Sequence, residues 1–405
     1  MNADVILVGY GRTWLDHIER LWPGARVLLV VEPAVVRDRR VRQHLAESWP
    51  GHELYELEYR RPLAADLFHL WHPELTARAI LPTDDTGVPF AARLAERLGL
   101  PGSGGVPAVI LSDKWRLRQL ADVAGVSSPA WQVVRDVAEA TAFAERAGGE
   151  IVLKPAARAG SSGVELVAEP AGLPAAWQRM FRSDAETYLA EQRVIGEQYS
   201  TNLLLDRGEV RFANVTGAHV TPGRHPVPVT HFVDPGLAPQ LHDTLVDAGR
   251  RLTVAAGFGT GFVHIEWIVR DGTPWLIEAA GRFPGGLMML LIGYAHEVDT
   301  MADYLAVMSG GPVPAVPPRP ARHATVALSV PASPGRVSAV HGTAQAAALP
   351  GVLAVELAVG AGDEVGELVS IPRIPGRVAA IGATLDEATR TARSALATVR
   401  IVTGG

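Results

Sequence analysis

Residues 261–286 read GFVHIEWIVRDGTPWLIEAAGRFPGG and combine a period-two hydrophobic pattern with a turn signal. The alternation predicts a β-strand with two unlike faces. One face carries Val263, Ile265, Trp267 and Val269, and the other carries His264, Glu266 and Ile268. Asp271-Gly272 marks the turn of a hairpin.

The predicted hairpin brings two glutamates together. If the connection is residues 271–273, Arg270 pairs with Pro274 and Glu266 lies directly opposite Glu278. Like charges opposite one another destabilise a sheet unless a positive charge lies between them. Carboxylate oxygens suit Mg²⁺, which also keeps water and substrate phosphate as ligands. The pair is therefore predicted to bind metal, although two solvated glutamates or a different register would also fit.

Arg282 follows Glu278 by four residues and precedes Phe-Pro-Gly-Gly. A guanidinium there could stabilise charge on a transferring phosphoryl group or a tetrahedral intermediate. A structural salt bridge is the alternative.

Residues 151–167, IVLKPAARAGSSGVELV, place Lys154 before a loop of small residues. A Walker loop has the opposite order, with the lysine after the glycines and a helix following. Here the sequence after Gly163 is typical of a strand. The loop is therefore either a flap that offers backbone N–H groups and the Ser161 and Ser162 hydroxyls to phosphate, or an ordinary hairpin.

Two further segments fit a nucleotide site. SDKWRLRQLADVAG predicts a helix with Ser112 as N-cap and Gly125 at its end, so Lys114 stands where a cation is unfavourable unless an anion is near. Residues 188–210 pass from an acidic hinge into a strand that could read adenine through backbone groups and bind ribose hydroxyls. A solvated lysine and a charged turn are the alternatives.

The N-terminal region alternates short apolar runs with segments compatible with helices. The runs are VILVGYGR, RVLLVVE at 26–32 and AILPTDD at 79–85, and one helical segment is FAARLAERLGL. This alternation predicts a parallel α/β unit. Glu32 lies where a ribose-binding acid would lie, but Trp14 replaces the third glycine of a dinucleotide motif, so a Rossmann-like unit that binds no NAD is favoured.

Composition limits the function classes. The 405 residues are 48% hydrophobic and 20% charged, with a formal charge of −6 and no cysteine. No basic field favours nucleic acid or a membrane, and disulfides and thiolate metal sites are impossible. No leader peptide and no apolar run of spanning length is recognised, so we expect a cytoplasmic protein.

Turn-rich stretches predict three domains. Glycines and prolines at 101–107 mark one junction, and GGPVPAVPPRP at 310–320 reads as a linker. We expect a Rossmann-like domain at 1–102, a two-lobed unit at 103–312 with one lobe at 126–192, and a small α+β domain at 313–405. In the last domain ATVALSV and GVLAVELAV read as strands, and LDEATRTARSALATVRIV as a helix.

The order and spacing of Lys114, Lys154, the Glu191 hinge and the Glu266, Glu278 and Arg282 set resemble the ATP-grasp superfamily. More narrowly, the chain resembles the carboxylate–amine ligases that join amino acids into dipeptides. The resemblance covers nearly the whole chain and implies an α/β and α+β fold: a Rossmann-like domain, a two-lobed ATP-grasp unit and a small C-terminal domain.

The resemblance implies a role for each matching residue. Lys114 and Lys154 would bind ATP phosphates under a flap at 159–163 that includes Gly163. The hinge from Glu191 to Val194 would meet adenine. Mg²⁺, or Mn²⁺ with the same ligands, would be held by Glu266 and Glu278.

Two positions depart from the family pattern. The ribose motif G-x-E-[YF]-S reads Gly196-Glu197-Gln198-Tyr199-Ser200, which leaves open whether Glu197 or Gln198 meets the ribose. The metal motif E-x-N-x-R carries Ala280 at the asparagine position. A small residue there is familiar in the dipeptide-ligase branch, so this departure narrows the assignment.

The implied reaction is two-step: ATP phosphorylates a carboxylate, and an amine then displaces phosphate. The carboxylate is expected to be an amino acid, or the γ-carboxyl of glutamate, and the amine a second amino acid. Candidate substrate residues are Arg224, His225, His231, His264, Gly285 and Gly286. The histidines could equally be incidental, or His264 a hydrogen-bonded strand residue.

Three readings of function remain open. The first is the amino-acid ligase, with small-molecule partners and a chain compatible with a homodimer. The second is an ATP-grasp ligase or carboxylase for another carboxylate or bicarbonate. The third is a nucleotide-binding protein without turnover.

Overall fold

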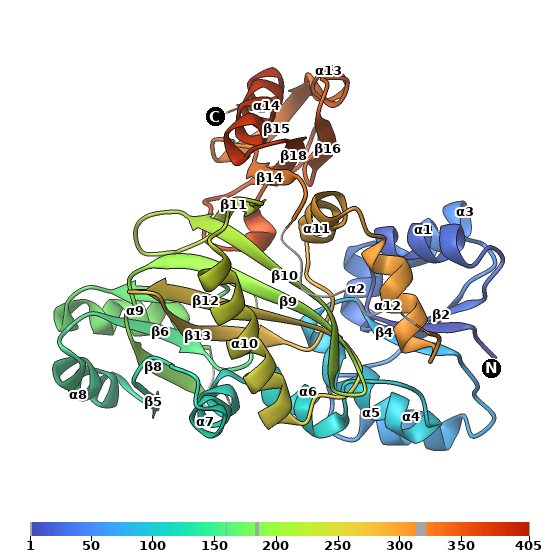
Figure 1. Ribbon diagram of the computed structural model, residues 1–405, viewed down its shortest axis with the longest axis horizontal. Coiled ribbons are helices and arrows are strands. Elements are labelled where there is room, and N and C mark those ends of the chain that lie inside the picture. The colour runs from blue at the N-terminus through green and yellow to red at the C-terminus, as the bar shows by residue number, and fades with distance from the viewer. Residues whose placement is uncertain (1, 159, 183–185, 313–320, 405) are drawn as a thin grey trace.

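The computed structural model describes residues 2–158, 160–182, 186–312 and 321–404. Four β-sheets organise these residues. Figure 1 shows the N-terminal unit on the right, a long central sheet, a smaller sheet at lower left and the C-terminal unit at the top. Within the described ranges, no helix is long and apolar enough to cross a membrane.

The N-terminal sheet is parallel, with strand order β3-β2-β1-β4. Its strands are β1 (Val5–Val8), β2 (Val27–Val31), β3 (Glu53–Glu56) and β4 (Ala79–Pro82). Its helices are α1 (Arg12–Leu21), α2 (Pro33–Asp38), α3 (Val41–Ser48), α4 (Ala64–Trp71) and α5 (Val88–Leu98), with the short η1 (Asp85–Gly87). β1, β2 and β4 are buried throughout, as a parallel sheet covered on both faces requires, so the predicted parallel α/β unit is confirmed.

Trp14 has a packing role in this unit. Its ring lies 5.2 Å from the Phe283 ring and 6.1 Å from the Tyr304 ring, centroid to centroid. The indole therefore joins the N-terminal unit to the central part of the chain, at the position where a dinucleotide motif would need glycine.

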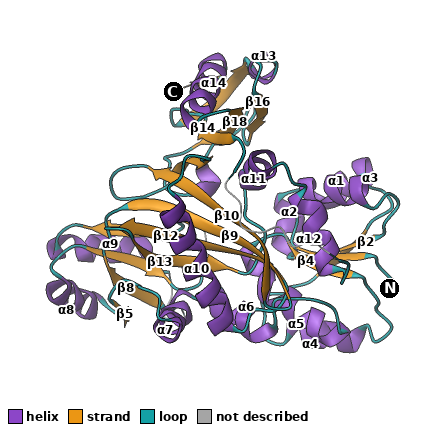
Figure 2. Ribbon diagram, in the orientation of Figure 1, coloured by secondary structure: helices purple, strands orange, loops and turns teal. Residues whose placement is uncertain are grey.

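The central sheet has the order β13-β12-β9-β10-β11-β14-β18-β16 and is antiparallel. Five strands precede residue 313: β9 (Glu197–Asp206), β10 (Glu209–Val220), β11 (Pro228–Val233), β12 (Gly261–Arg270) and β13 (Thr273–Ala280). The helices that accompany these five strands, outside the N-terminal unit and the smaller sheet, are α6 (Gly105–Leu111), α7 (Lys114–Ala124), α10 (Pro239–Ala256), α11 (Met288–His296) and α12 (Thr300–Met308). Helix α10 lies across one face of β9 and β10 (Figure 2).

The two faces of β12 differ as predicted. Val263, Ile265, Trp267 and Val269 are buried in the core that includes α7 and α10. On the other face, Phe262 packs in the core shared with the N-terminal unit, and Glu266 faces a cavity. Polar residues are thus displayed along one half of a strand whose other face is dry.

The hairpin register is partly as predicted. Glu266 does lie opposite Glu278, but the turn is Asp271-Gly272 alone, so Arg270 pairs with Thr273 and not with Pro274. A register shift between Glu266 and Trp267 leaves Ile277 without an opposite residue and restores the alignment of the glutamates. The predicted three-residue turn is therefore wrong, and a β-bulge supplies the extra residue.

The smaller sheet has the order β5-β8-β6-β7. Its elements are β5 (Trp131–Val134), β6 (Ile151–Pro155), β7 (Glu165–Val167), β8 (Tyr188–Gln192), α8 (Val137–Ala147), η2 (Pro170–Gly172) and α9 (Leu173–Met180). We call this region, together with the loop between β6 and β7, the flap lobe. The antiparallel β6–β7 pair confirms that strands flank the glycine loop.

The C-terminal unit extends the central sheet through pairing of β11 with β14. Its elements are β14 (Ala324–Ser329), β15 (Gly335–His341), α13 (Thr343–Ala347), β16 (Val352–Leu357), β17 (Glu364–Val365), η3 (Ile371–Arg373), β18 (Gly376–Gly382), α14 (Leu385–Thr398) and β19 (Arg400–Gly404). The predicted helix over LDEATRTARSALATVRIV ends at Thr398, because Arg400–Gly404 pairs with β15. Residues 313–320 of the predicted linker, and the boundary at 313, lie outside the described residues.

Gly196 tests the packing at the start of β9. A Cβ there would lie 2.1 Å from the Val269 carbonyl oxygen, so Gly196→Ala should displace β9 from β12 and destabilise the fold by about 1–3 kcal/mol. The measurement is the midpoint of urea unfolding. Gly51→Ala is the matched control, since nothing lies within 4 Å of its added Cβ. Equal stability of the two variants would contradict the close approach.

Candidate active site

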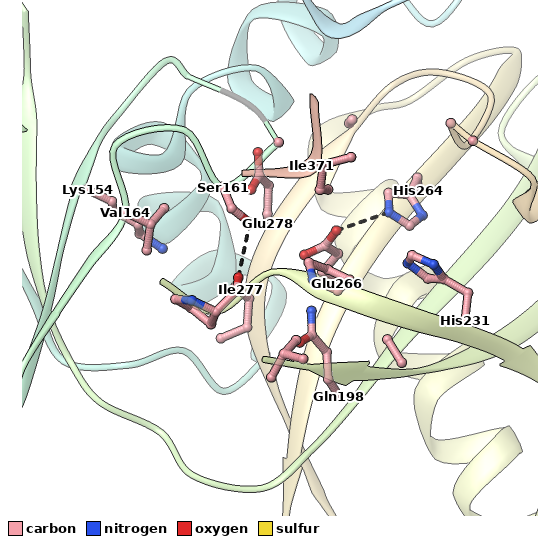
Figure 3. A pocket seen from close by; sticks show the side chains of 18 of the residues that line it. Lys154, Ser161, Val164, Gln198, His231, His264, Glu266, Ile277, Glu278 and Ile371 are labelled. Atoms are coloured by element: carbon pink, nitrogen blue, oxygen red, sulfur yellow. Dashed lines mark hydrogen bonds and ion pairs between the residues drawn. The ribbon is translucent and has the colours of Figure 1, made fainter. Parts of the chain in front are cut away.

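A cavity of ≈ 960 Å³ lies on the polar half of the central sheet. The flap lobe, β12, β13 and the N-terminal unit all contribute to its wall, as does β18 of the C-terminal unit. Figure 3 shows Lys154, Ser161 and Val164 on one side, Glu266 and Glu278 in the middle, and His231 and His264 on the other side. The predicted metal pair therefore lies between two chemically different halves.

Glu266 and Glu278 each keep one nitrogen partner. The Lys114 Nζ donates to Glu278 Oε1 at 2.9 Å, and His264 Nε2 lies 3.3 Å from Glu266 Oε1. Burial opposes ionisation of Glu266, but the hydrogen bond and charge of His264 outweigh it and lower the pKa of this carboxyl. The Glu266 carboxyl is thus suited to remain charged.

The pair fits a Mg²⁺ that shares its ligands with substrate. No cluster of three or more His, Cys, Asp or Glu able to hold a metal occurs in the described ranges. Two carboxylates, each with its second oxygen free of hydrogen bonds to described residues, match an ion that takes one or two protein carboxylates and completes its shell with water and phosphate. Ala280, opposite His264, supplies no ligand.

Lys114 begins α7 as predicted, but its N-cap is Asp113 and not Ser112. The Asp113 carboxylate accepts from the backbone N–H groups of Trp115 and Arg116, which satisfies donors that Ser112 does not reach. Gly125 ends the helix in the left-handed conformation, as predicted. The anion beside Lys114 is a protein carboxylate, Glu278.

Lys154, on β6, belongs to a buried ion network. Its Nζ lies 2.6 Å from Glu191 Oε2, while Arg118 donates Nε and Nη2 to the two Glu191 oxygens at 3.0 Å each. Arg118 Nη2 also donates to the Ile277 carbonyl at 2.8 Å. Glu191 therefore contributes its carboxylate as the counter-ion of Lys154, and only its backbone is free to meet a ligand.

The segment around Val194 and Gln198 lines the cavity beside the flap lobe. Glu197 accepts a hydrogen bond from the Tyr199 hydroxyl at 3.1 Å. Gln198 shares its strand face with Ser200, the residue opposite Glu266, and Figure 3 shows its amide directed toward Glu266. Both residues line the cavity, and Glu197 is the one engaged by a described side chain.

The flap residues contact two other parts of the chain. Ser161 Oγ donates to the Pro226 carbonyl at 3.3 Å, and the Gly160 carbonyl accepts from the Ile371 N–H at 3.1 Å. Ser161 lines the cavity, whereas Ser162 is exposed and Gly163 is not part of the lining. Residue 159 of the predicted flap lies outside the described residues.

Arg282 lines the cavity but is held by the N-terminal unit. Its Nε and Nη2 donate to the two carboxylate oxygens of Asp85 at 2.6 and 2.9 Å, and Nη1 donates to the Phe283 carbonyl. Burial favours neutral Arg282, yet the charge and hydrogen bonds of Asp85 raise its pKa. The salt bridge foreseen as an alternative is present, and it leaves the guanidinium at the cavity surface.

The predicted substrate residues separate into two groups. His231, His264, Gly285 and Gly286 line the cavity. Arg224 and His225 do not belong to the described lining; the Arg224 carbonyl accepts from Leu166 N, and His225 Nδ1 lies 3.3 Å from the Val164 carbonyl. These two residues contact the flap lobe instead.

Asp85, Arg118 and Arg377 are site residues that sequence reasoning missed. Asp85 follows a parallel strand at its carboxyl end, the usual place for ligand-binding residues, so its position was a usable signal. Arg118 lies four residues after Lys114 and shares its helix face. Arg377 had no local signal.

Comparison with known proteins agrees with this geometry. Residues 148–289 match the family model described as an ATP-grasp domain. Residues 327–404 match the model described as L-amino acid ligase C-terminal domain 2.

Two sequence relatives show how far this chain has diverged in sequence from known proteins. An uncharacterised protein, y4rH, of Sinorhizobium fredii is 28% identical over 67% of this chain and 57% of its own length. A D-alanine–D-alanine ligase of Halorhodospira halophila is 30% identical over 47% of this chain and 64% of its own. The chain thus spans about three fifths of the length of these relatives.

Solved structures share the fold across the whole chain. An L-amino acid ligase from Bacillus licheniformis has a TM-score of 0.81 at 17% identity, covering 100% of this chain and 99% of that one. A phosphoribosylglycinamide synthetase from Anaerococcus prevotii has a TM-score of 0.73 at 15% identity, covering 100% of both chains.

The fold and the family match together define the class: the chain carries an ATP-grasp domain, matched over residues 148–289. Beyond that domain, residues 327–404 match a C-terminal domain described for L-amino acid ligases.

Lys154 generates a prediction about pH. Burial lowers the pKa of Lys154 to about 8 from 10.5, although the charge of Glu191 acts in the opposite direction. Because the charged form binds phosphate, the dissociation constant for ATP should rise as pH increases through about 8. Titrations from pH 6.5 to 9.5 measure this, and Lys154→Arg, which stays charged, should flatten the profile.

The expected weakening of ATP binding above about pH 8 does not come from unfolding of the protein. The folded-state pKa lies below the unfolded value, so between about pH 8 and 10.5 the unfolded chain binds the extra proton. The contribution of Lys154 to the free energy of unfolding therefore increases with pH in this window. Constant ATP affinity up to pH 9.5 would contradict a role for the Lys154 charge.

Asp85 generates a second prediction. Asp85→Asn keeps the shape and one acceptor but removes the charge that orients Arg282, so kcat should fall about tenfold with little change in the KM for ATP. Asp66→Asn is the matched control, since Asp66 lies outside the cavity lining and its carboxylate likewise accepts hydrogen bonds from arginine side chains, those of Arg93 and Arg97. Steady-state ADP release measures both, and equal kcat values in the two variants would make Asp85 a purely structural contact.

Proposed function

We propose that this protein joins the carboxylate of one amino acid to the amine of a second at the expense of ATP, releasing ADP and phosphate. The observation that carries the proposal is the alignment of Glu266 opposite Glu278 in one cavity that Lys114, Arg282 and the flap lobe also line. Nucleotide binding alone would not require this full set. The activated group could be an α-carboxyl or the γ-carboxyl of glutamate.

ATP would occupy the half of the cavity beside the flap lobe. Lys114 and Lys154 would contact its phosphates, residues 160–163 would cover them, and the backbone from Glu191 to Val194 would meet adenine. Gln198 would take the ribose contact, since Glu197 is engaged by Tyr199. A closed flap excludes water, which protects an activated carboxyl from hydrolysis.

Glu266 and Glu278 would hold Mg²⁺, or Mn²⁺, together with the phosphates. The ion would offset phosphate charge and align the transferring group. The residues of the chain then have separable tasks: the two lysines bind phosphate, and the His264 contact holds Glu266 in its ionised form.

The proposed reaction has two steps, formation of an acyl phosphate and its displacement by an amine. An oxygen of the substrate carboxylate attacks the γ-phosphorus of ATP, and ADP leaves, which gives an acyl phosphate. The amine nitrogen then attacks the acyl carbon, the C–O bond to phosphate breaks, and the amine loses a proton. Arg282, fixed by Asp85, would stabilise the oxyanion that develops between attack and departure.

The first experiment is ADP release with Mg²⁺, ATP and a panel of amino-acid pairs that includes glutamate with diverse amines. At least one pair should stimulate release above an ATP-only blank, and mass spectrometry of the mixture should show the condensed product. A parallel arm with bicarbonate and non-amino-acid carboxylates tests the carboxylase reading. Stimulation in that arm alone would replace the proposal.

Glu278→Gln tests the metal pair. The amide can still accept from Lys114 but loses the charge that a divalent cation needs, so turnover should fall by at least about a thousandfold and ATP binding should lose its dependence on Mg²⁺. The thermal unfolding midpoint should change little. Normal turnover in this variant would sink the metal assignment.

A further inference from the structure

Arg377 of β18 is a cavity residue from the C-terminal unit. Its side chain is half-buried, and no hydrogen bond or ion pair to it is found among residues 2–158, 160–182, 186–312 and 321–404. A half-buried guanidinium without a counter-ion is costly, because a charge loses hydration on burial and needs compensation. Binding of an anion would therefore stabilise the Arg377 guanidinium.

The other buried cations of the cavity already have their anions. Lys114 pairs with Glu278, Arg282 pairs with Asp85, and Lys154 shares Glu191 with Arg118. These cations all lie toward the nucleotide half or the metal pair. Arg377 is on the side of the cavity formed by β11, β14 and β18.

One carboxylate of the chain could in principle serve Arg377. Glu356 lies opposite it on β16. Glu356 is exposed, however, and the two side chains form no ion pair in the part of the chain that the structure describes. Burial lowers the pKa of Arg377, and Glu356 offsets this only in part.

The surroundings of Arg377 leave room for a small anion. His231, Ala327 and Ala379 are aligned across β11, β14 and β18, and Ala379 lies two residues after Arg377 on the same strand face, where the two alanines present only methyl groups. Burial, with the positive charge of Arg377, lowers the pKa of His231 to about 4. Near neutral pH His231 is an uncharged hydrogen-bonding group, and Arg377 supplies the positive charge.

A diglycine segment connects this end of the cavity to the reaction centre. A Cβ on Gly285 would lie 3.9 Å from Arg282 Nη1, and a Cβ on Gly286 would lie 3.8 Å from Arg377 Cζ. Consecutive residues thus approach both guanidiniums, which places Arg377 within the span of one small molecule from Arg282. The absence of side chains at both positions keeps the path between them open.

We propose that Arg377 binds a carboxylate group of an amino-acid substrate, and that this carboxylate is one that the reaction leaves unchanged. This inference rests on the proposed function and assigns a specificity-determining residue to it. The carboxylate comes either from the amine substrate, as its α-carboxylate, or from a dicarboxylic acyl donor. A planar guanidinium binds either one through paired N–H donors.

The test compares Arg377→Met, Arg377→Lys and Glu356→Gln in full-length protein. With the substrate pair that turns over, Arg377→Met should raise the KM for the carboxylate-bearing substrate at least about tenfold and leave the KM for ATP unchanged. Arg377→Lys should recover part of the loss. Glu356→Gln should stay within about twofold of the parent.

Matched substrates identify which carboxylate is bound. Replacing an amino-acid amine substrate by its α-carboxamide tests the first source. The second source is tested by replacing glutamate with the amide of its unreacted carboxylate, which is glutamine when the α-carboxyl is activated and isoglutamine when the γ-carboxyl is activated. The carboxylate bound by Arg377 is the one whose replacement by an amide raises the KM in the parent protein but not in Arg377→Met. Equal effects of Arg377→Met on acid and neutral analogue, or the same effects from Glu356→Gln, would overturn the assignment.

A binding measurement separates this inference from the ligase proposal. Calorimetry with L-glutamate, L-glutamine, L-alanine and L-alaninamide, in the presence of Mg²⁺ and a non-hydrolysable ATP analogue, needs no turnover. Preference for an acid over its amide, lost in Arg377→Met, supports the carboxylate site even if no pair stimulates ADP release. Absence of any such preference in the parent protein overturns it even if ligation occurs.

Discussion

The close approach of Glu266 and Glu278 is the constraint that the rest of the site satisfies. Two carboxylates directly opposite each other on neighbouring strands repel, and the chain stabilises them with one nitrogen each: the ammonium of Lys114 and the imidazole of His264. The arrangement leaves a carboxylate oxygen on each residue for a metal. It also requires a fixed register, because a slip of one residue would turn Glu266 into the apolar core under α10.

A second set of charges connects the flap lobe to this hairpin. Arg118 binds Glu191 of β8 and the Ile277 carbonyl of β13, and Glu191 in turn holds Lys154. Buried ion networks contribute little net stability, because desolvation offsets their attraction. This network is better explained as a positioning device. It fixes Lys154 of the flap lobe relative to Ile277, the residue that precedes Glu278.

The sequence predicted those parts of the fold that depend on local pattern. Alternation assigned the two faces of β12, and the glycine loop between strands identified the flap lobe. Local pattern failed at the hairpin turn, because a bulge and a shorter turn give the same Glu266–Glu278 alignment as a longer turn without a bulge. It also failed at the N-cap of α7, where Ser112 and Asp113 are both suitable residues and only backbone geometry distinguishes them.

The contacts that were not predicted are long-range. Arg282 and Asp85 are separated by 197 positions, and Arg118 and Glu191 by 73, so no window of sequence contains either pair. Arg224 and His225 stand close to the cavity in sequence, yet they turn toward the flap lobe because the β10–β11 connection packs against it. Sequence proximity to a site is therefore weaker guidance than a place on a strand face.

The cavity wall has two parts, and they match a division of the proposed function. Residues proposed for ATP and metal come from the flap lobe, α7, β9 and the β12–β13 hairpin, and ion pairs connect the flap lobe and α7 to the hairpin region. The remaining wall comes from Asp85 of the N-terminal unit and from His231 and Arg377, which meet only when β11, β14 and β18 pair. The ion pairs of Lys114, Lys154 and Glu191 do not involve that pairing, so substitutions on the facing residues of β11, β14 and β18 can alter which acid or amine is accepted while ATP binding stays the same.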